Sequence, residues 1–123
     1  MSYVKFDTPE KLQDELKRLL DTIADTRGSK IRKGMNETTK SIERSTAKLV
    51  VMAENVTPPE IVLHLPILCE EKGIPYGYVG KQEDLGHAVR INVSASAIAV
   101  EDAGSSQNER ELESMAERLQ NLK

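Results

Sequence analysis

The strongest constraint on the fold is a set of short, uninterrupted apolar runs separated by helical patterns. Leu49–Ala53 is apolar at all five positions and is bounded by polar residues. A strand of this kind must be covered on both faces, which is typical of parallel or mixed sheets with helices above and below. Further strands are expected at 31–33, 74–79 and 97–100, where the sequence is again extended or apolar in character.

Helical patterns occupy the sequence between these strands. Thr8 and Pro9 have the pattern of an N-cap and a first-turn proline, and Asn36 and Ser106 are further expected N-caps, the last in a capping box. We expect helices at about 9–25, 36–44, 58–72 with a restart at Pro66, 81–88 and 106–122. Helices that alternate with apolar strands predict an α/β protein, here a three-layer α/β/α sandwich with a central mixed sheet of about four strands.

The length of 123 residues is that of one ordinary domain. We therefore expect a single domain over 1–123, with a hinge at 103–106 before a C-terminal helix that packs on the same domain. Aromatic residues are scarce, with one Phe and three Tyr, so the core is expected to consist of Leu, Ile, Val and Ala. The same scarcity argues against a protein that stacks successive bases of single-stranded nucleic acid on rings.

Cysteine and histidine are too few for several kinds of site. Cys69 is the only cysteine and there are two histidines, so we expect no disulfide, no metal site and no cofactor. The N-terminus lacks the apolar segment of a secretory signal, and no apolar run approaches the length of a membrane span. These observations predict a cytoplasmic protein that does not associate with a membrane.

Positive charge is concentrated in one segment of an acidic chain. Residues 27–48 hold seven basic and two acidic side chains, a local balance of +5 in a chain of net charge −3. The remainder of the chain therefore carries −8. Charge segregated in this way indicates a surface for a polyanion.

Inside this basic segment lie side chains that can do more than hold phosphate. Gly34 lets a backbone approach a ligand closely, and Asn36 and Lys40 are spaced to share one face of a helix. Glu37 would repel phosphate but can accept hydrogen bonds from base amines and imino groups. From the residues alone a second interpretation stays open, in which Asn36 only caps the helix, Glu37 only answers the helix dipole and the lysines only solubilise.

Residues 31–40, I-R-K-G-M-N-E-T-T-K, resemble the signature R-K-G-x-N-E-x-T-K of the kink-turn RNA-binding family. This family includes archaeal and eukaryotic large-subunit ribosomal proteins and the core protein of box C/D small ribonucleoproteins. The similarity continues through 49–53, 58–66, 68–76 and 81–88, covers nearly the whole chain, and is strongest to the archaeal members.

The resemblance implies binding of a sharply bent RNA with two stems, a short bulge and tandem sheared G·A pairs. It implies that Asn36 and Glu37 contact the guanines of those pairs and that Lys40 bonds a base or sugar beside them. Lys33 and Gly34 would hold the RNA backbone. Looped-out bases and exposed guanine edges are where RNA sequence can be read.

Other parts of the same RNA-binding set come from outside the signature. Ile61 matches an apolar position that faces the bulge, and Ile91 and Val93 belong to a loop expected to close over an extruded nucleotide. Arg32, the first residue of the signature, also belongs to the expected set. Arg90 stands where Gly is frequent in the family, and Val93 stands where some members carry Arg. An apolar loop would read the bulge by shape, which suits a protein that serves several RNAs.

The resemblance also implies the partners. Kink-turns in ribosomal RNA and guide RNAs are expected, within the large ribosomal subunit, box C/D and H/ACA guide ribonucleoproteins and ribonuclease P, together with other proteins of these particles. No small-molecule substrate and no enzymatic activity are expected.

Two hypotheses of other classes stay open. One is a small α/β enzyme that uses Cys69 or the Glu37/Lys40 pair, for which a deep pocket with a nucleophile and a base would be the evidence. The other is a protein-interaction adaptor that works through the C-terminal helix.

Overall fold

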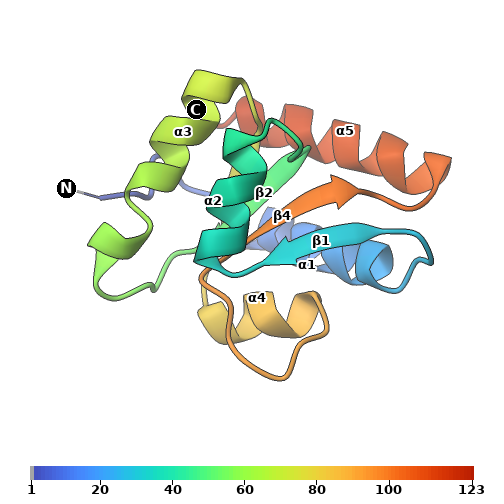
Figure 1. The fold of residues 1–123 in the computed structure, drawn as a ribbon, viewed down its shortest axis with the longest axis horizontal. Coiled ribbons are helices and arrows are strands. Elements are labelled where there is room, and N and C mark those ends of the chain that lie inside the picture. The colour runs from blue at the N-terminus through green and yellow to red at the C-terminus, as the bar shows by residue number, and fades with distance from the viewer. Residues whose placement is uncertain (1) are drawn as a thin grey trace.

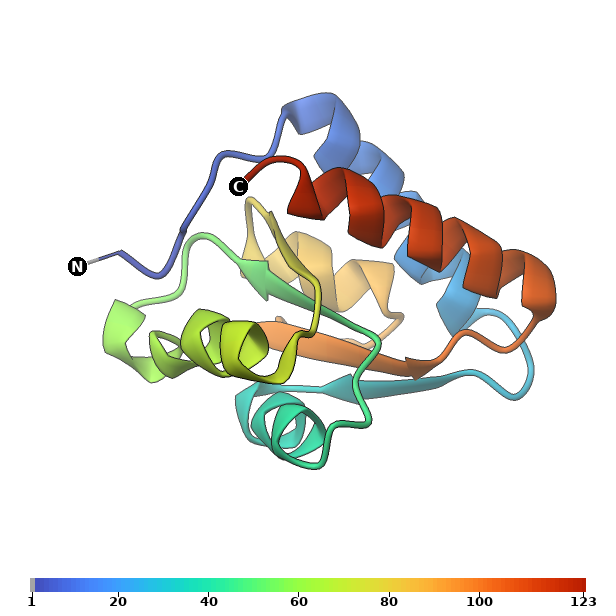
Figure 2. The same cartoon turned by 90° about the horizontal axis from the view of Figure 1, so that it is seen from above.

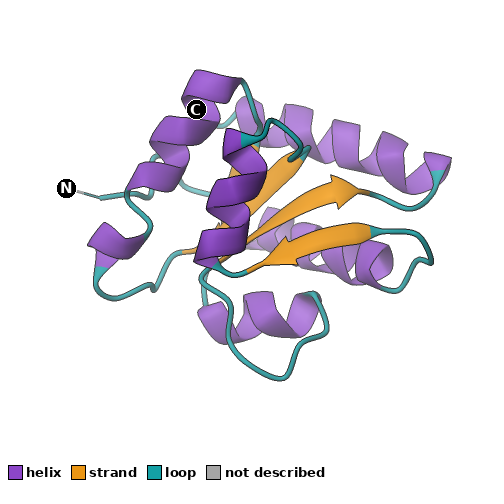
Figure 3. Cartoon of the chain, in the orientation of Figure 1, coloured by secondary structure: helices purple, strands orange, loops and turns teal. Residues whose placement is uncertain are grey.

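The computed structural model describes residues 2–123 as helices packed around one sheet (Figures 1 and 3). The strands are β1 (Lys30–Lys33), β2 (Leu49–Ala53), β3 (Tyr76–Val79) and β4 (Ala97–Asp102). The helices are α1 (Glu10–Ala24), α2 (Met35–Glu43), α3 (His64–Lys72), α4 (Gln82–Ala88) and α5 (Ser106–Gln120), with a 3₁₀ turn, η1, at Pro59–Ile61. None of the helices within 2–123 combines the length and apolar character needed to cross a membrane.

The sheet is mixed, and its strand order is β1-β4-β2-β3. β2 and β3 are parallel, whereas β4 is antiparallel to both β1 and β2. It follows that β1, β2 and β3 all end at the same edge of the sheet, where β4 begins. The register shows this directly, because Ala97 at the start of β4 pairs with Met52 near the end of β2, and Ala53 pairs with Val79.

The helices form a layer on each face of the sheet (Figure 2). α2 and α3 cover one face, and α1, α4 and α5 cover the other. The predicted three-layer architecture with a four-stranded mixed sheet is therefore confirmed. β2 lies in the middle of the sheet and is buried at every residue, as its uninterrupted apolar sequence predicted.

The few aromatic residues gather in one cluster rather than being spread through the core. Tyr3, Phe6, Tyr76 and Tyr78 are all buried and pack against one another. The Tyr3 hydroxyl donates to the carbonyl of Ala53 and accepts from the backbone N–H of Val56 in the next loop. The N-terminal segment is thereby fixed against the end of β2, and no Phe or Tyr ring of residues 2–123 is left exposed for base stacking.

All three predicted N-caps were wrong by one or two residues. Pro9, not Thr8, occupies the cap position of α1, and the buried Thr8 hydroxyl has no hydrogen-bond partner within 2–123. Gly34 precedes α2 in place of Asn36. Ser105, not Ser106, accepts the N–H of the third helical residue of α5.

The helix predicted at 58–72 is broken as expected, but the break falls before His64 and not at Pro66. The chain forms η1, bends, and begins α3 at His64, so Pro66 lies in the first turn of α3, where its missing N–H costs no hydrogen bond. Gly73 ends α3 in the left-handed conformation, as expected. The break leaves Ile61 40% exposed instead of on a buried helix face.

The predicted hinge region is bonded on both sides. Asn108 in the first turn of α5 donates to the Ala103 carbonyl and to the Thr26 hydroxyl just beyond α1, each at 2.9 Å. Gly104 between them has a positive φ of 89°, and a Cβ there would lie 2.7 Å from Thr26 Cγ2. These contacts fix the start of α5 to the end of α1.

Candidate nucleic-acid interface

The predicted site residues come from three segments that leave the same edge of the sheet. α2 follows β1, the segment with η1 follows β2, and the loop at 91–96 precedes β4. Backbone hydrogen bonds join them to the sheet, since Gly34 N donates to the Ala97 carbonyl and Ala53 N to the Ser96 carbonyl, at 2.9 and 3.0 Å. Open edges of this kind, at the carboxyl ends of strands, are where α/β folds commonly bind ligands.

Gly34 forms the turn from β1 into α2. Its φ of 101° lies in a region that residues with a side chain rarely adopt, and its carbonyl accepts the first helical hydrogen bond, from Thr38 N at 2.9 Å. No atom lies within 4 Å of the place where a Cβ would be. The requirement for glycine here therefore comes from the backbone angle, and the space beside it is open to a ligand.

Asn36, Glu37 and Lys40 all point out of the protein. Asn36 is exposed and makes no side-chain hydrogen bond to any residue in 2–123. Glu37 and Lys40 are one turn apart, with 47% and 54% of their side chains exposed, and Lys40 Nζ lies 3.5 Å from Glu37 Oε2. An exposed pair of this length is weak and readily exchanged for other partners. The exposed side of α2 thus presents an amide and a carboxylate from its first turn, and an ammonium group one turn later.

The opposite side of α2 is anchored. Thr38 and Ile42 are fully buried against the sheet. Thr39 bonds backwards to the Met35 carbonyl at 2.9 Å and sideways to His64 Nε2 of α3 at 3.0 Å. His64 therefore joins the two helices on this face, which accounts for it without a catalytic role.

Acids from elsewhere in the chain neutralise much of the basic segment. Lys48 pairs with Glu109 of α5 at 2.9 Å, while Arg32 and Lys30 both approach Glu101 of β4. Among residues 2–123, the basic side chains of this segment without an ion pair are Arg27, Lys33 and Arg44. The positive surface predicted from the local sequence is real but carries less unpaired charge than the count indicated.

Glu101 was not predicted as part of the site. Its side chain is only 11% exposed and accepts from Ser41 Oγ at 2.6 Å, Thr46 Oγ1 at 2.7 Å and Arg32 Nε at 3.1 Å. Burial opposes ionisation of this carboxyl, but the hydrogen bonds from two hydroxyls and a guanidinium outweigh it and lower the pKa of Glu101. The sequence feature that could have indicated its role is an acid directly after the apolar run of β4, because a charge beside buried residues needs partners.

Two apolar side chains of the predicted set are exposed and one is not. Ile61 and Val93 are 40% and 69% exposed, whereas Ile91 is half-buried and packs against the core. The Val93 loop lies directly on α4, where a Cβ on Gly86 would stand 2.1 Å from the Val93 carbonyl oxygen. Gly86 therefore lets the loop approach α4 this closely.

Arg90 starts this loop with a φ of 63°, which explains why glycine would be favourable there. Its guanidinium donates to two acids. Nε lies 2.8 Å from Asp21 Oδ1 within α1, and one Nη lies 2.7 Å from Oδ1 of Asp25, the C-cap of α1. The hydrogen bond from Arg90 lowers the pKa of Asp21. The loop is thus attached to α1 through a side chain that glycine could not provide.

The features expected of the enzyme hypothesis are not found at the named residues. Cys69 is fully buried, and burial raises the pKa of its thiol to about 12, so it is a neutral core residue at physiological pH. Glu37 and Lys40 stand on an exposed helix surface. Within 2–123 no group of three or more His, Cys, Asp and Glu side chains is arranged to hold a metal ion.

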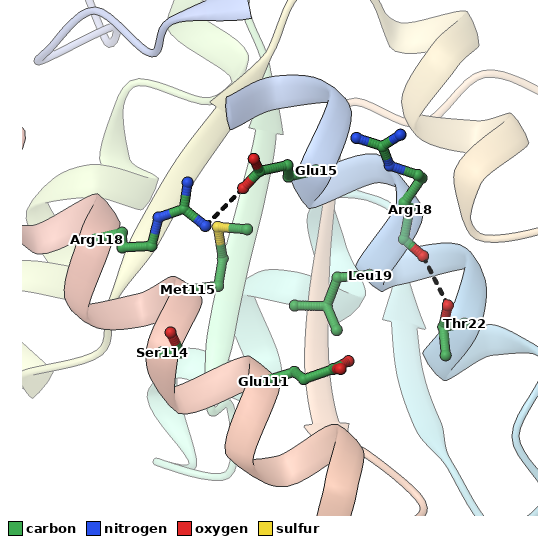
Figure 4. A pocket seen from close by; sticks show the side chains of 8 residues that line it. All are labelled: Glu15, Arg18, Leu19, Thr22, Glu111, Ser114, Met115 and Arg118. Carbon is green, nitrogen blue, oxygen red and sulfur yellow. Dashed lines mark hydrogen bonds and ion pairs between the residues drawn. The ribbon is translucent and has the colours of Figure 1, made fainter. Parts of the chain in front are cut away.

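A groove of about 340 Å³ lies between α1 and α5 on the other face (Figure 4). Arg118 of α5 and Glu15 of α1 join its walls by an ion pair of 2.6 Å. The apolar stripe of α5, with Leu112 and Leu119, is buried against the sheet. The terminal helix is therefore part of the core, and an adaptor surface on it would be limited to its outer side.

Comparison with known proteins agrees with this arrangement. Residues 14–109 match the model of the Ribosomal protein L7Ae/L30e/S12e/Gadd45 family. The chain belongs to this family. The matched range of the L7Ae/L30e/S12e/Gadd45 family includes the first turn of α2, η1 and the loop at 91–96.

A solved structure supports the same relationship at the level of the fold. The Giardia lamblia 15.5kD RNA binding protein superimposes with a TM-score of 0.89 at 30% sequence identity, and the match covers 98% of each chain. The protein therefore shares its fold, over 98% of the chain, with a protein described as binding RNA.

Proposed function

We propose that this protein binds RNA and recognises kink-turns through the first turn of α2. The observation that carries the proposal is the exposed group of Asn36, Glu37 and Lys40 beside the open backbone of Gly34, on a family member that shares its fold with an RNA-binding protein. If Asn36 only capped the helix, its side chain would bond a backbone N–H of α2, but Gly34 holds the cap position and no side chain within 2–123 forms a cap hydrogen bond there.

The chemistry matches guanine edges better than phosphate. Glu37 can only accept hydrogen bonds, and a guanine presents an amine and an imino group that donate them. Asn36 can both donate and accept, and the N-terminus of α2 adds the positive end of the helix dipole. Lys33 has no ion pair within 2–123 and stands at the end of β1, so it is placed to hold a phosphate next to these bases.

The exposed apolar residues complete the proposed surface. Ile61 and Val93 would contact unstacked nucleotides of the bulge by shape, with Ile91 supporting the loop from beneath. Arg32 donates from Nε to Glu101, and 34% of its side chain stays exposed. We assign it to supporting the surface instead of contacting phosphate.

A protein that binds a bent RNA and not its extended form shifts the population toward the bend. This property suits a component of the large ribosomal subunit, and a core protein shared among box C/D and H/ACA guide ribonucleoproteins and ribonuclease P. No step of this proposed function requires a cofactor or a catalytic group.

The test compares Glu37→Gln with Glu43→Gln on a kink-turn RNA and on the same stems without the bulge. Both substitutions remove one exposed carboxylate from α2, but only Glu37 lies in its first turn. Loss of the acceptor should weaken kink-turn binding by ~1–3 kcal/mol, while Glu43→Gln leaves it unchanged. Equal affinity of both variants and the parent protein for the kink-turn would exclude base recognition by Glu37.

A further inference from the structure

α2 packs on β4 (Figure 1). Glu101 belongs to β4, and its two carboxylate oxygens have different partners. Oε2 accepts the hydroxyls of Ser41 and Thr46, which belong to the second half of α2 and the loop after it. Oε1 accepts Arg32 Nε at 3.1 Å and lies 3.9 Å from Lys30 Nζ, both on β1. One carboxylate therefore accepts hydrogen bonds from α2, from the loop after it and from Arg32, and forms a longer ion pair with Lys30.

The burial of this carboxylate needs a reason. Removing a charge from water costs free energy that its partners must offset, so a buried ion pair contributes little net stability. The pair between Lys48 and Glu109 is more exposed, with 32% of the acid's side chain accessible against 11% for Glu101. A solvated acid or an apolar residue at this position of β4 would avoid the free energy of burying a charge. The buried carboxylate is explained if the position of the cations matters.

Those cations stand close to the proposed RNA contacts. Arg32 is two residues before Gly34, where β1 turns into α2, and Ser41 is one helical turn from Glu37 along α2. Without Glu101, Arg32 and Lys30 would be unpaired and available to a phosphate chain on this face of the sheet. Phosphate contacts raise affinity for every RNA alike, because they carry no sequence information.

We propose that Glu101 is a specificity-determining residue that holds Arg32 and Lys30 back from RNA phosphates. The basic surface then offers few unpaired cations, and binding depends on the base contacts of α2. This inference rests on the proposed function for its meaning, but its test uses RNA without a kink-turn and so stands apart from that function.

The experiment measures binding of the full chain to a regular RNA duplex as a function of salt. Each additional phosphate contact steepens the dependence of log K on log salt by about 0.9, which is about an eight-fold gain between 1 M and 0.1 M. Glu101→Gln should therefore bind the duplex at least about five-fold more tightly at 0.1 M salt, with a slope steeper by about one unit. Glu113→Gln is the matched control, since it removes an exposed acid of α5 that pairs with no cation in 2–123.

The second arm asks whether Arg32 is the cation that Glu101 restrains. Arg32→Gln should leave duplex binding of the parent protein unchanged, and in the Glu101→Gln background it should remove most of the gain. If Arg32→Gln weakens duplex binding equally in both backgrounds, Arg32 already contacts phosphate in the parent protein, which overturns the inference. If it weakens binding in neither background, Arg32 is not the restrained cation, which overturns the inference as well. Equal gains from Glu101→Gln and Glu113→Gln would overturn it too, because net charge alone would then explain the result.

Thermal unfolding shows whether each variant is folded at the assay temperature. Should Glu101→Gln not fold, Arg32→Gln and Lys30→Gln still decide the question in the parent protein, with Lys33→Gln as the comparison. Replacing a restrained cation, by Arg32→Gln or Lys30→Gln, should leave duplex affinity unchanged. Replacing the unpaired Lys33 should lower duplex affinity. Failure of the parent protein to prefer a kink-turn over the duplex would refute the proposed function and leave these comparisons intact.

Discussion

Gly86→Ala is the substitution for which the structure makes the sharpest prediction. A Cβ at this position of α4 would lie 2.1 Å from the carbonyl oxygen of Val93 and 3.2 Å from Ser94 Cα. Non-bonded atoms normally stay ~3.5 Å apart, so the loop or the helix must move by more than about 1 Å. The atom in the way belongs to the backbone, so no side-chain rotation can relieve the contact.

The expected magnitude is a balance of two effects. Replacing Gly by Ala inside a helix contributes about 1 kcal/mol in favour of the folded state. Overpacking typically costs ~1–3 kcal/mol, and a clash with backbone belongs at the upper end of that range. We therefore expect Gly86→Ala to lower the free energy of unfolding by about 1–2 kcal/mol. If the loop moves instead, stability is kept and the proposed RNA contact of Val93 is lost.

The assay combines urea unfolding with kink-turn affinity, and Gly80→Ala is the control. Gly80 lies between β3 and α4, and the nearest atom to its Cβ position is Gln13 Oε1 at 3.6 Å, an ordinary contact. Gly80→Ala should alter neither property by a measurable amount. The reasoning is refuted if Gly86→Ala matches the parent protein in both stability and RNA affinity, because the close approach of the loop would then not exist in solution.

Three further predictions follow from single residues. Lys33→Ala should weaken RNA binding and flatten its salt slope by about one unit, whereas Lys72→Ala at the far end of α3 should not; an unaltered slope for Lys33→Ala would argue against a phosphate contact. Leu16 is fully buried in α1, so Leu16→Ala should destabilise the fold by ~2–5 kcal/mol in urea unfolding, and a smaller loss would mean that its surroundings collapse into the space. The pKa of Glu101 is lower in the folded state than its ordinary value of 4.5, so this group contributes stability above that pH and loses it as the pH falls through the folded pKa. Melting temperatures from pH 7 down to pH 3 should accordingly fall less steeply for Glu101→Gln than for the parent protein, and parallel curves would contradict the assigned hydrogen bonds.

The elements of the fold were predictable because their signals are local. Leu49–Ala53 has no polar residue to place in water, so it could only be a strand covered on both faces, and it is. The caps were not predictable to the residue, because the cap position depends on backbone angles that the side chains alone do not specify. Ser105 and Ser106 differ in the backbone angles that the preceding turn imposes, and Gly34 displaced Asn36 because only glycine suits a φ of 101°.

The candidate site was predictable only in part, for a related reason. Asn36, Glu37 and Lys40 lie within one helical turn, so their common face followed from spacing. The partners of the basic segment lie far away in sequence, as Arg32 and Glu101 do across 69 positions. A charge count over a window cannot include an acid from another strand, and it therefore overstated the unpaired charge of the surface.

Arg90 shows how a distant contact can replace a local preference. Glycine is the residue that a positive φ favours, and Arg90 adopts 63° at the start of the loop that carries Val93. Its hydrogen bonds to Asp21 and Asp25 give the arginine partners that only the folded chain brings near. A glycine would relax the backbone but leave the loop unattached to α1 and the two acids unpaired. Because binding costs less when a loop is already ordered, the strained arginine and its acids are best understood together, as one device that holds the loop in place before RNA arrives.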